Sequence, residues 1–254
     1  MASFPQHLLD GYRAFTSQRL PTEQTRYQEL SERGQSPAVM VIGCCDSRVS
    51  PEVIFDAGPG ELFVVRNVAN LVPVFQPDGG AHGVSAALEY AVQVLRIKHI
   101  VVLGHAQCGG IRAFIDDIDP LSPGDFIGRW MAMFIKPGEK VGQREHETRQ
   151  EFTTRIEKAA VFRSLENLMT FPFVRSRVER GEMELHGAYF GVAEGSLFVL
   201  DPEAKEFRSV REEAYAAKRS LNPHGEEARS AVSNHVAPLV PFILRDARYA
   251  RSSG

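Results

Sequence analysis

Two apolar, β-rich segments, residues 38–42 and 100–103, are each followed directly by a short run that contains cysteine or histidine. Buried parallel strands are short and rich in Val, Ile and Leu, and open α/β sheets bind ligands beyond the carboxyl ends of their strands. The first run places Cys44 and Asp46 just past one segment, and the second places His105 and Cys108 just past the other. We therefore expect two buried parallel strands whose ends bring these side chains into one crevice.

The rest of the chain shows a strand–helix–strand rhythm. Further strands are predicted near 62–65, 184–192 and 197–200. A crossover helix is predicted over 83–95, with one apolar side formed by Ala86, Ala87, Tyr90, Ala91 and Val94. Leu and aromatic residues at helical spacing predict two helices over 5–33, and an apolar stripe predicts another over 144–180, interrupted at Pro172. The fold class is therefore α/β, with a mostly parallel central sheet of four to five strands flanked by helices and preceded by an N-terminal helical arm.

The composition changes near residue 211. A polar stretch rich in Ala, Arg, Ser and Glu leads into an apolar patch at 236–244. A patch this apolar favours burial against other protein surface. We divide the chain into one domain over 1–210, which includes the arm, and a C-terminal extension over 211–254 that docks on this domain or on a partner subunit.

Charge and cysteine content narrow the class of protein. The net charge is −3 and no block of Lys and Arg occurs, so neither nucleic acid nor a membrane surface is an expected partner. Three cysteines, an odd number, argue against a disulfide framework and for a reducing compartment. The N-terminal residues do not resemble a signal peptide and no apolar run reaches about 18 residues, which favours a cytoplasmic protein.

Cys44, His105 and Cys108 have the chemistry of a catalytic zinc site. Zinc accepts thiolate and imidazole together, and catalytic sites combine three protein ligands with one position for water. About sixty residues separate the first ligand from the other two. The fold, and not a local zinc ribbon, must assemble such a site.

The two runs contain the complete motifs Cys-x-Asp-Ser-Arg, at 44–48, and His-x-x-Cys, at 105–108. In these motifs the chain resembles the β-class carbonic anhydrases, and the resemblance extends over about residues 25–200, through segments 34–37, 60–70, 87–92, 166–168 and 185–190. It implies a zinc enzyme that hydrates carbon dioxide reversibly to bicarbonate and a proton, by attack of zinc-bound hydroxide. It also implies a homodimer or a dimer of dimers.

The resemblance assigns roles to further residues. Arg48 orients Asp46, which accepts a hydrogen bond from the hydroxide; if Arg48 releases it, Asp46 can become the fourth zinc ligand in a closed state. The substrate pocket is carried over onto a second set of residues, in which Gln35 is the polar donor and a backbone N–H at a helix start assists: Gln35, Phe63, Val68, Tyr90 and Gly109, with Gly110 beside it.

One departure concerns regulation. Some bacterial members of the family have a bicarbonate site built from Trp, Arg and Tyr, and alignment on Cys44 puts Val41, Arg66 and Phe190 at these places. Two of the three groups are missing. The resemblance is therefore to the plant-like members, whose sites are open, and we expect no cooperative inhibition by bicarbonate.

Alternative interpretations stay open at this level. A hydrolase of carbonyl sulfide or carbon disulfide on the same scaffold would share the zinc chemistry, and an inactive relative would keep the metal for structure alone. Taken singly, Phe63 and Val68 are typical core residues, and His186 is expected to be a hydrogen-bonded structural histidine.

Overall fold

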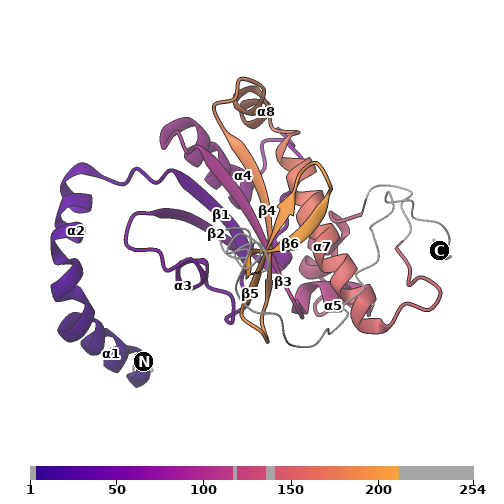
Figure 1. Cartoon of the computed structure of the whole chain (residues 1–254), viewed down its shortest axis with the longest axis horizontal. Helices are drawn as coiled ribbons and strands as arrows, with labels where there is room; N and C mark the ends of the chain where they lie inside the picture. Colours follow the sequence, from indigo (N-terminus) through magenta and orange to yellow (C-terminus); the bar gives the residue numbers. More distant parts are fainter. Residues whose placement is uncertain (1–3, 117–118, 136–140, 212–254) are drawn as a thin grey trace, which may run out of the picture.

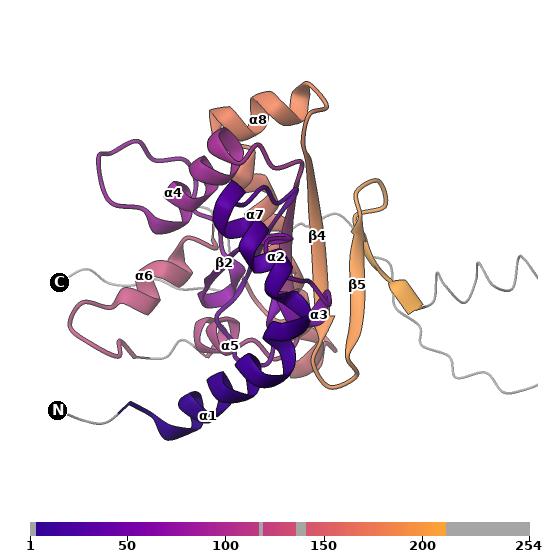
Figure 2. The same ribbon diagram turned by 90° about the vertical axis from the view of Figure 1, so that its left-hand side faces the viewer.

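A six-stranded sheet forms the centre of the molecule in the computed structural model, which describes residues 4–116, 119–135 and 141–211. The strand order is β2-β1-β3-β4-β5-β6. The strands β1 to β4 pair in parallel, whereas β5 and β6 are antiparallel additions at one edge (Figure 2). Their bounds are β1 Val39–Cys44, β2 Leu62–Asn67, β3 His99–His105, β4 Glu184–Gly191, β5 Ser196–Asp201 and β6 Glu206–Ser209.

Helices connect the parallel strands. Gly34, with φ of 77°, ends the arm helix α2, and a capping box between Thr148 and Glu151 begins α7. Pro172 begins α8 as the first helical residue. The bounds are α1 Gln6–Ala14, η1 Phe15–Arg19, α2 Leu20–Arg33, α3 Pro51–Ile54, η2 Val68–Asn70, α4 Gly83–Glu89, η3 Tyr90–Val94, α5 Gly109–Ile115, α6 Phe126–Ala132, α7 Arg149–Leu168 and α8 Pro172–Glu179.

The two faces of the sheet are covered differently. One face packs Met40, Ile42 and Ile100 against apolar residues of α4, η3, α7 and α8, and these strand residues are fully buried. The opposite face carries a smaller cluster around Val41 and Leu103, in which most neighbours are only partly buried. The main hydrophobic core therefore lies between the sheet and its helices, and the second face stays partly open.

The N-terminal arm lies apart from this core. Helices α1, η1 and α2 contain no buried residue, and Figure 1 shows them standing away from the sheet. The apolar side chains of Leu8 and Tyr12 are exposed. Near its C-terminal end the arm reaches the body, where Arg26 Nε donates to the Pro59 carbonyl over 3.2 Å.

The α/β fold, the mostly parallel sheet and the helical arm confirm the sequence prediction. The sixth strand, β6, is an addition, because four residues of mixed polarity are too few to show a period. The crossover helix buries Leu88, Ala91 and Val92, and exposes Tyr90 and Val94, so the predicted apolar side was right at Ala91 and wrong at Tyr90 and Val94. Its second half, η3, is a π-helical turn, which shifts the facing positions relative to an ideal helix.

Part of the sequence interpretation lies outside the described residues. The extension at 212–254, and with it the apolar patch at 236–244, belongs to this part, so its docking stays a prediction. Among the helices that the structure describes, none combines the length and hydrophobicity that crossing a membrane requires.

Candidate metal centre

The three predicted ligands meet at the carboxyl ends of β1 and β3, where the order of strand addition to the sheet reverses. Cys44 is the last residue of β1 and His105 the last of β3, and these strands are neighbours with Gly43 opposite Leu103. The chain leaves β1 for β2 on one side, while β3 lies on the other. Such a switch point leaves a crevice beyond the strand ends. Cys108, the residue directly before α5, also lies at this crevice.

The ligand atoms are close enough to hold one metal ion. The sulfur atoms and a ring nitrogen of the three residues lie within 4.8 Å of one another. The Cys44 and Cys108 Sγ atoms are 3.9 Å apart, near the separation of about 3.8 Å that two sulfurs at about 2.3 Å from a tetrahedral zinc would have. All three side chains are buried, and within the described residues His105 Nε2 has no hydrogen-bond partner. The donors present fit zinc.

The Cys44 and Cys108 thiols interact directly, and this contact moves their pKa values in opposite directions. A hydrogen bond from the Cys108 thiol lowers the pKa of Cys44 to about 4. The same hydrogen bond, with burial, raises the pKa of Cys108 far above its usual value. One thiolate is thus already present near neutral pH, and metal binding has to displace the proton of the other.

Asp46 is held as an oriented carboxylate beside the ligands. Arg48 Nε and Nη2 donate to its two oxygens over 2.9 and 2.7 Å, and the Arg48 backbone N–H donates over 3.0 Å. These donors hold the pKa of Asp46 well below its ordinary value. Arg48 Nη2 also donates to the carbonyl of Gln107 over 3.0 Å, which ties the pair to the loop between His105 and Cys108.

Backbone contacts fix the first motif. Arg66 of β2 donates to the carbonyl oxygens of Cys44 and Asp46 over 2.8 and 2.7 Å. The N–H of Ala69 donates to Cys44 Sγ over 3.4 Å, and Ala69 has a left-handed φ of 63°. A non-glycine residue in this region is uncommon and points to a functional turn. The sulfur is therefore partly stabilised as a thiolate by the η2 turn.

Sequence interpretation missed Glu157, which fixes the backbone of Cys108 through a hydrogen bond. Glu157 Oε1 accepts the backbone N–H of Cys108 over 2.9 Å, and Oε2 accepts the Tyr189 hydroxyl over 2.7 Å. The side chain is only 2% exposed, and burial raises its pKa. The available signal was a glutamate inside the apolar stripe of α7, next to Ile156.

The predicted substrate residues fall into two groups. Val68 and Gly109 lie beside the ligands, since the η2 turn that begins at Val68 packs on the start of α5. Phe63 pairs with Met40, four residues before Cys44, or about 13 Å along the strand at about 3.3 Å per residue.

Two further predicted substrate residues, Tyr90 and Gln35, lie with Phe63 toward the amino ends of the strands. The Tyr90 ring is 6.0 Å from that of Phe63, and its side chain is exposed. Gln35 is exposed and precedes β1 by four residues. A single chain therefore does not bring Gln35, Phe63 and Tyr90 to its own metal ligands.

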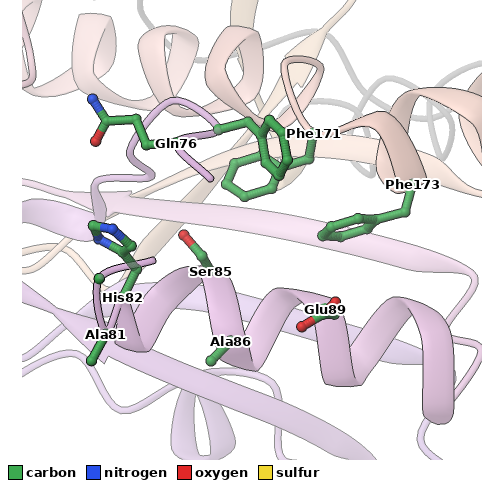
Figure 3. A pocket seen from close by; sticks show the side chains of 10 residues that line it. Gln76, Ala81, His82, Ser85, Ala86, Glu89, Phe171 and Phe173 are labelled. Atoms are coloured by element: carbon green, nitrogen blue, oxygen red, sulfur yellow. The ribbon is translucent and has the colours of Figure 1, made fainter. Parts of the chain in front are cut away.

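A separate cavity of about 270 Å³ lies beside α4. Figure 3 shows Phe171 and Phe173 on one side of it and His82, Ser85 and Glu89 on the other. None of the residues that line it belongs to the predicted site.

The comparisons with known proteins agree with this geometry. The family model described as carbonic anhydrase matches residues 39–197. A carbonic anhydrase from Pseudomonas aeruginosa is 34% identical over 205 residues, which cover 81% of this chain and 91% of that protein. The chain belongs to the carbonic anhydrase family.

Further relatives place this carbonic anhydrase in the β-class. Beta carbonic anhydrase 3 of Arabidopsis thaliana is 34% identical over 201 residues, 77% of each chain. The β-carbonic anhydrase CcaA has a TM-score of 0.72 at 27% identity, covering 80% of this chain and 91% of that one. A structure described as a tetrameric β-carbonic anhydrase of Sordaria macrospora has a TM-score of 0.64 at 26% identity, covering 77% and 95%. The protein is accordingly an enzyme of the carbonate dehydratase type, a lyase.

Proposed function

We propose that this carbonic anhydrase holds one zinc ion with Cys44, His105 and Cys108 and uses it to hydrate carbon dioxide reversibly to bicarbonate and a proton. The observation that supports this most is the convergence of three buried ligand atoms beside an ionised, oriented carboxylate, in a chain of this family. When bound, zinc supplies a water of lowered pKa, so that a hydroxide nucleophile exists near neutral pH.

Asp46, held by Arg48, orients the nucleophile through a hydrogen bond. With both carboxylate oxygens facing Arg48, Asp46 stays ionised and acts only as a hydrogen-bond acceptor. A carboxylate in this state accepts a hydrogen bond from the nucleophile. This hydrogen bond orients the nucleophile, so that a lone pair on the oxygen of the nucleophile points toward the carbon of the substrate. The side chain of Asp46 is 16% exposed, which leaves it reachable from the crevice.

The substrate pocket requires a second copy of the chain. Val68 and the backbone N–H of Gly109 serve the metal site of their own chain, whereas Gln35, Phe63 and Tyr90 lie near the opposite ends of the strands. In a twofold dimer, the second set of residues in each copy lies against the metal site of its partner. The exposed apolar side chains of the arm favour the same association. We infer a homodimer or a dimer of dimers, in line with the tetrameric assembly named for the Sordaria relative.

The zinc assignment is tested by metal analysis and stopped-flow carbon dioxide hydration on the same preparations. Each single alanine variant of Cys44, His105 and Cys108 is expected to lose the metal and the activity, because two remaining ligands bind zinc weakly. An unchanged number of bound zinc ions in Cys108→Ala, relative to the unaltered protein, would overturn the assignment. Parallel assays with carbonyl sulfide and carbon disulfide test the substrate assignment. Faster turnover of either compound than of carbon dioxide would make that compound the assigned substrate.

The shared pocket is tested by mixing two weakly active variants, Asp46→Asn and Tyr90→Ala. If each site combines Asp46 of one copy with Tyr90 of the other, random exchange makes half of the dimers mixed, with one intact site in each, so about a quarter of all sites recover. No recovery after verified subunit exchange, or an active monomer in sedimentation, would contradict the inference.

The state of Asp46 has its own test. We expect the open arrangement near pH 8, with Asp46 held by Arg48, and hyperbolic rather than cooperative inhibition by bicarbonate, because Val41 and Phe190 replace two groups of the bacterial bicarbonate site. A bicarbonate titration of the hydration rate decides, since a sigmoidal curve would show that these positions do not control the switch. A cytoplasmic location stays a prediction.

A further inference from the structure

A second cluster of metal-binding side chains lies at the other end of the sheet. His99 is the first residue of β3, Glu184 is its direct partner at the start of β4, and His186 follows two residues later on the same face. Within the described residues, two groups of three such side chains bring their ligand atoms within 4.8 Å of one another. One is the metal centre described above, and the other is this triad.

The triad has the dimensions of a preformed coordination face. His99 Nδ1 lies 3.2 Å from His186 Nε2 and 3.4 Å from Glu184 Oε2, and His186 Nε2 lies 3.5 Å from the same oxygen. Two ligands at about 2.0–2.2 Å from a tetrahedral zinc are separated by about 3.3–3.6 Å. All three edges of the triangle are therefore close to the zinc geometry, without movement of either strand.

The chemical state of the triad also suits a metal ion. Imidazole nitrogens and carboxylate oxygens are ordinary zinc ligands, and His99 Nδ1 and His186 Nε2 both face the same Glu184 oxygen. The side chains of His99 and His186 are 39% and 38% exposed and Glu184 is 68% exposed. Water can therefore complete the coordination from the open side.

We propose that His99, Glu184 and His186 bind a second divalent transition-metal ion, with zinc as the expected occupant. Two imidazoles and one carboxylate are a common ligand set for zinc, whereas magnesium prefers oxygen ligands alone. His99 and His105 stand at opposite ends of β3, about 20 Å apart at about 3.3 Å per residue. The ion is thus remote from the catalytic ligands, and it would link the first residues of two neighbouring strands.

Calorimetric titration of zinc into the protein counts the sites. When metal analysis shows one zinc per chain at the start, one further equivalent is expected to bind; a metal-free preparation is expected to take up two. His99→Ala and His186→Ala each remove the second equivalent, and Glu184→Gln weakens it at least tenfold. Millimolar magnesium does not compete, because two of the three donors are nitrogen.

His82→Ala is the matched control. His82 also faces a carboxylate, Asp78, over 2.7 Å, but no third ligand from the part of the chain that the structure describes completes a group there. This variant is expected to keep the second equivalent. Circular dichroism and the occupancy of the first site report whether each variant folds.

Two results would overturn the proposal: no second equivalent in the unaltered protein, or a second equivalent that survives in both His99→Ala and His186→Ala. The first would leave the pair as hydrogen-bonded histidines. Failure of the proposed catalytic zinc site would appear separately, because Cys108→Ala removes only the equivalent that the histidine variants retain.

Discussion

Glu157 offers the sharpest test of how the metal centre is supported. It is 2% exposed and accepts hydrogen bonds from the Cys108 N–H and the Tyr189 hydroxyl, two groups that are themselves buried. Glu157→Ala leaves both donors without this acceptor. Since each buried unsatisfied group costs about 1–3 kcal/mol, the free energy of unfolding should fall by about 2–6 kcal/mol.

Glu157→Gln is the matched variant, because it keeps the shape and one carbonyl oxygen. That oxygen still accepts the Cys108 N–H, while the amide nitrogen can donate to the Tyr189 hydroxyl oxygen. The buried charge disappears as well, and the loss of unfolding free energy should stay below about 1.5 kcal/mol. In Glu157→Ala the loop that carries Cys108 loses its anchor, so zinc affinity should fall about 10–100-fold, as for other groups that orient a ligand.

Urea denaturation followed by circular dichroism measures the first quantity, and competition with a chromogenic chelator measures the second. The pH dependence provides a separate check. Because burial raises the pKa of Glu157, the folded protein binds this proton more tightly than the unfolded chain does, and the contribution of Glu157 to stability falls as the pH rises above the ordinary glutamate range. Glu157→Gln does not titrate, so its stability relative to the unaltered protein should improve with rising pH. Equal destabilisation in the Ala and Gln variants would refute the role assigned to these hydrogen bonds.

Two further predictions concern the frame around the site. A Cβ on Gly110 would lie 2.5 Å from Val68 Cγ1, so Gly110→Ala should cost about 1–3 kcal/mol in urea unfolding, whereas Gly83→Ala, where the Cβ meets open space, should be neutral or stabilising; equal stability of the two variants would contradict this. Arg155 donates to both oxygens of Glu147 over 2.7 and 2.8 Å and lowers its pKa, so Glu147→Gln should lose about 1–3 kcal/mol at pH 7. That loss should shrink as the pH falls below the ordinary glutamate range, where the native ion pair is lost too, and a pH-independent difference would show that the charge plays no part.

The sequence by itself determined the chemistry of the centre. Apolar β-rich segments predict buried strands, and ligand residues directly after them predict a site beyond the strand ends, because parallel strands end at one edge. The placement of Cys44, His105 and Cys108 follows from this logic, whereas the pairing of Asp46 with Arg48 was implied by the resemblance of their motif to the family. These are local patterns joined by one rule of topology.

Only the tertiary structure decided which distant groups meet. Glu157 reaches Cys108 because α7 crosses the sheet behind the loop, and no spacing in the sequence encodes that contact. Likewise, His99 and His186 are 87 residues apart and meet through the register of β3 and β4. The approach of the Tyr90 and Phe63 rings to 6.0 Å also appears only in three dimensions, since it depends on how the crossover helix packs on the sheet. Hydrophobic periodicity records which face of an element is buried, whereas crossover and register determine which faces come together.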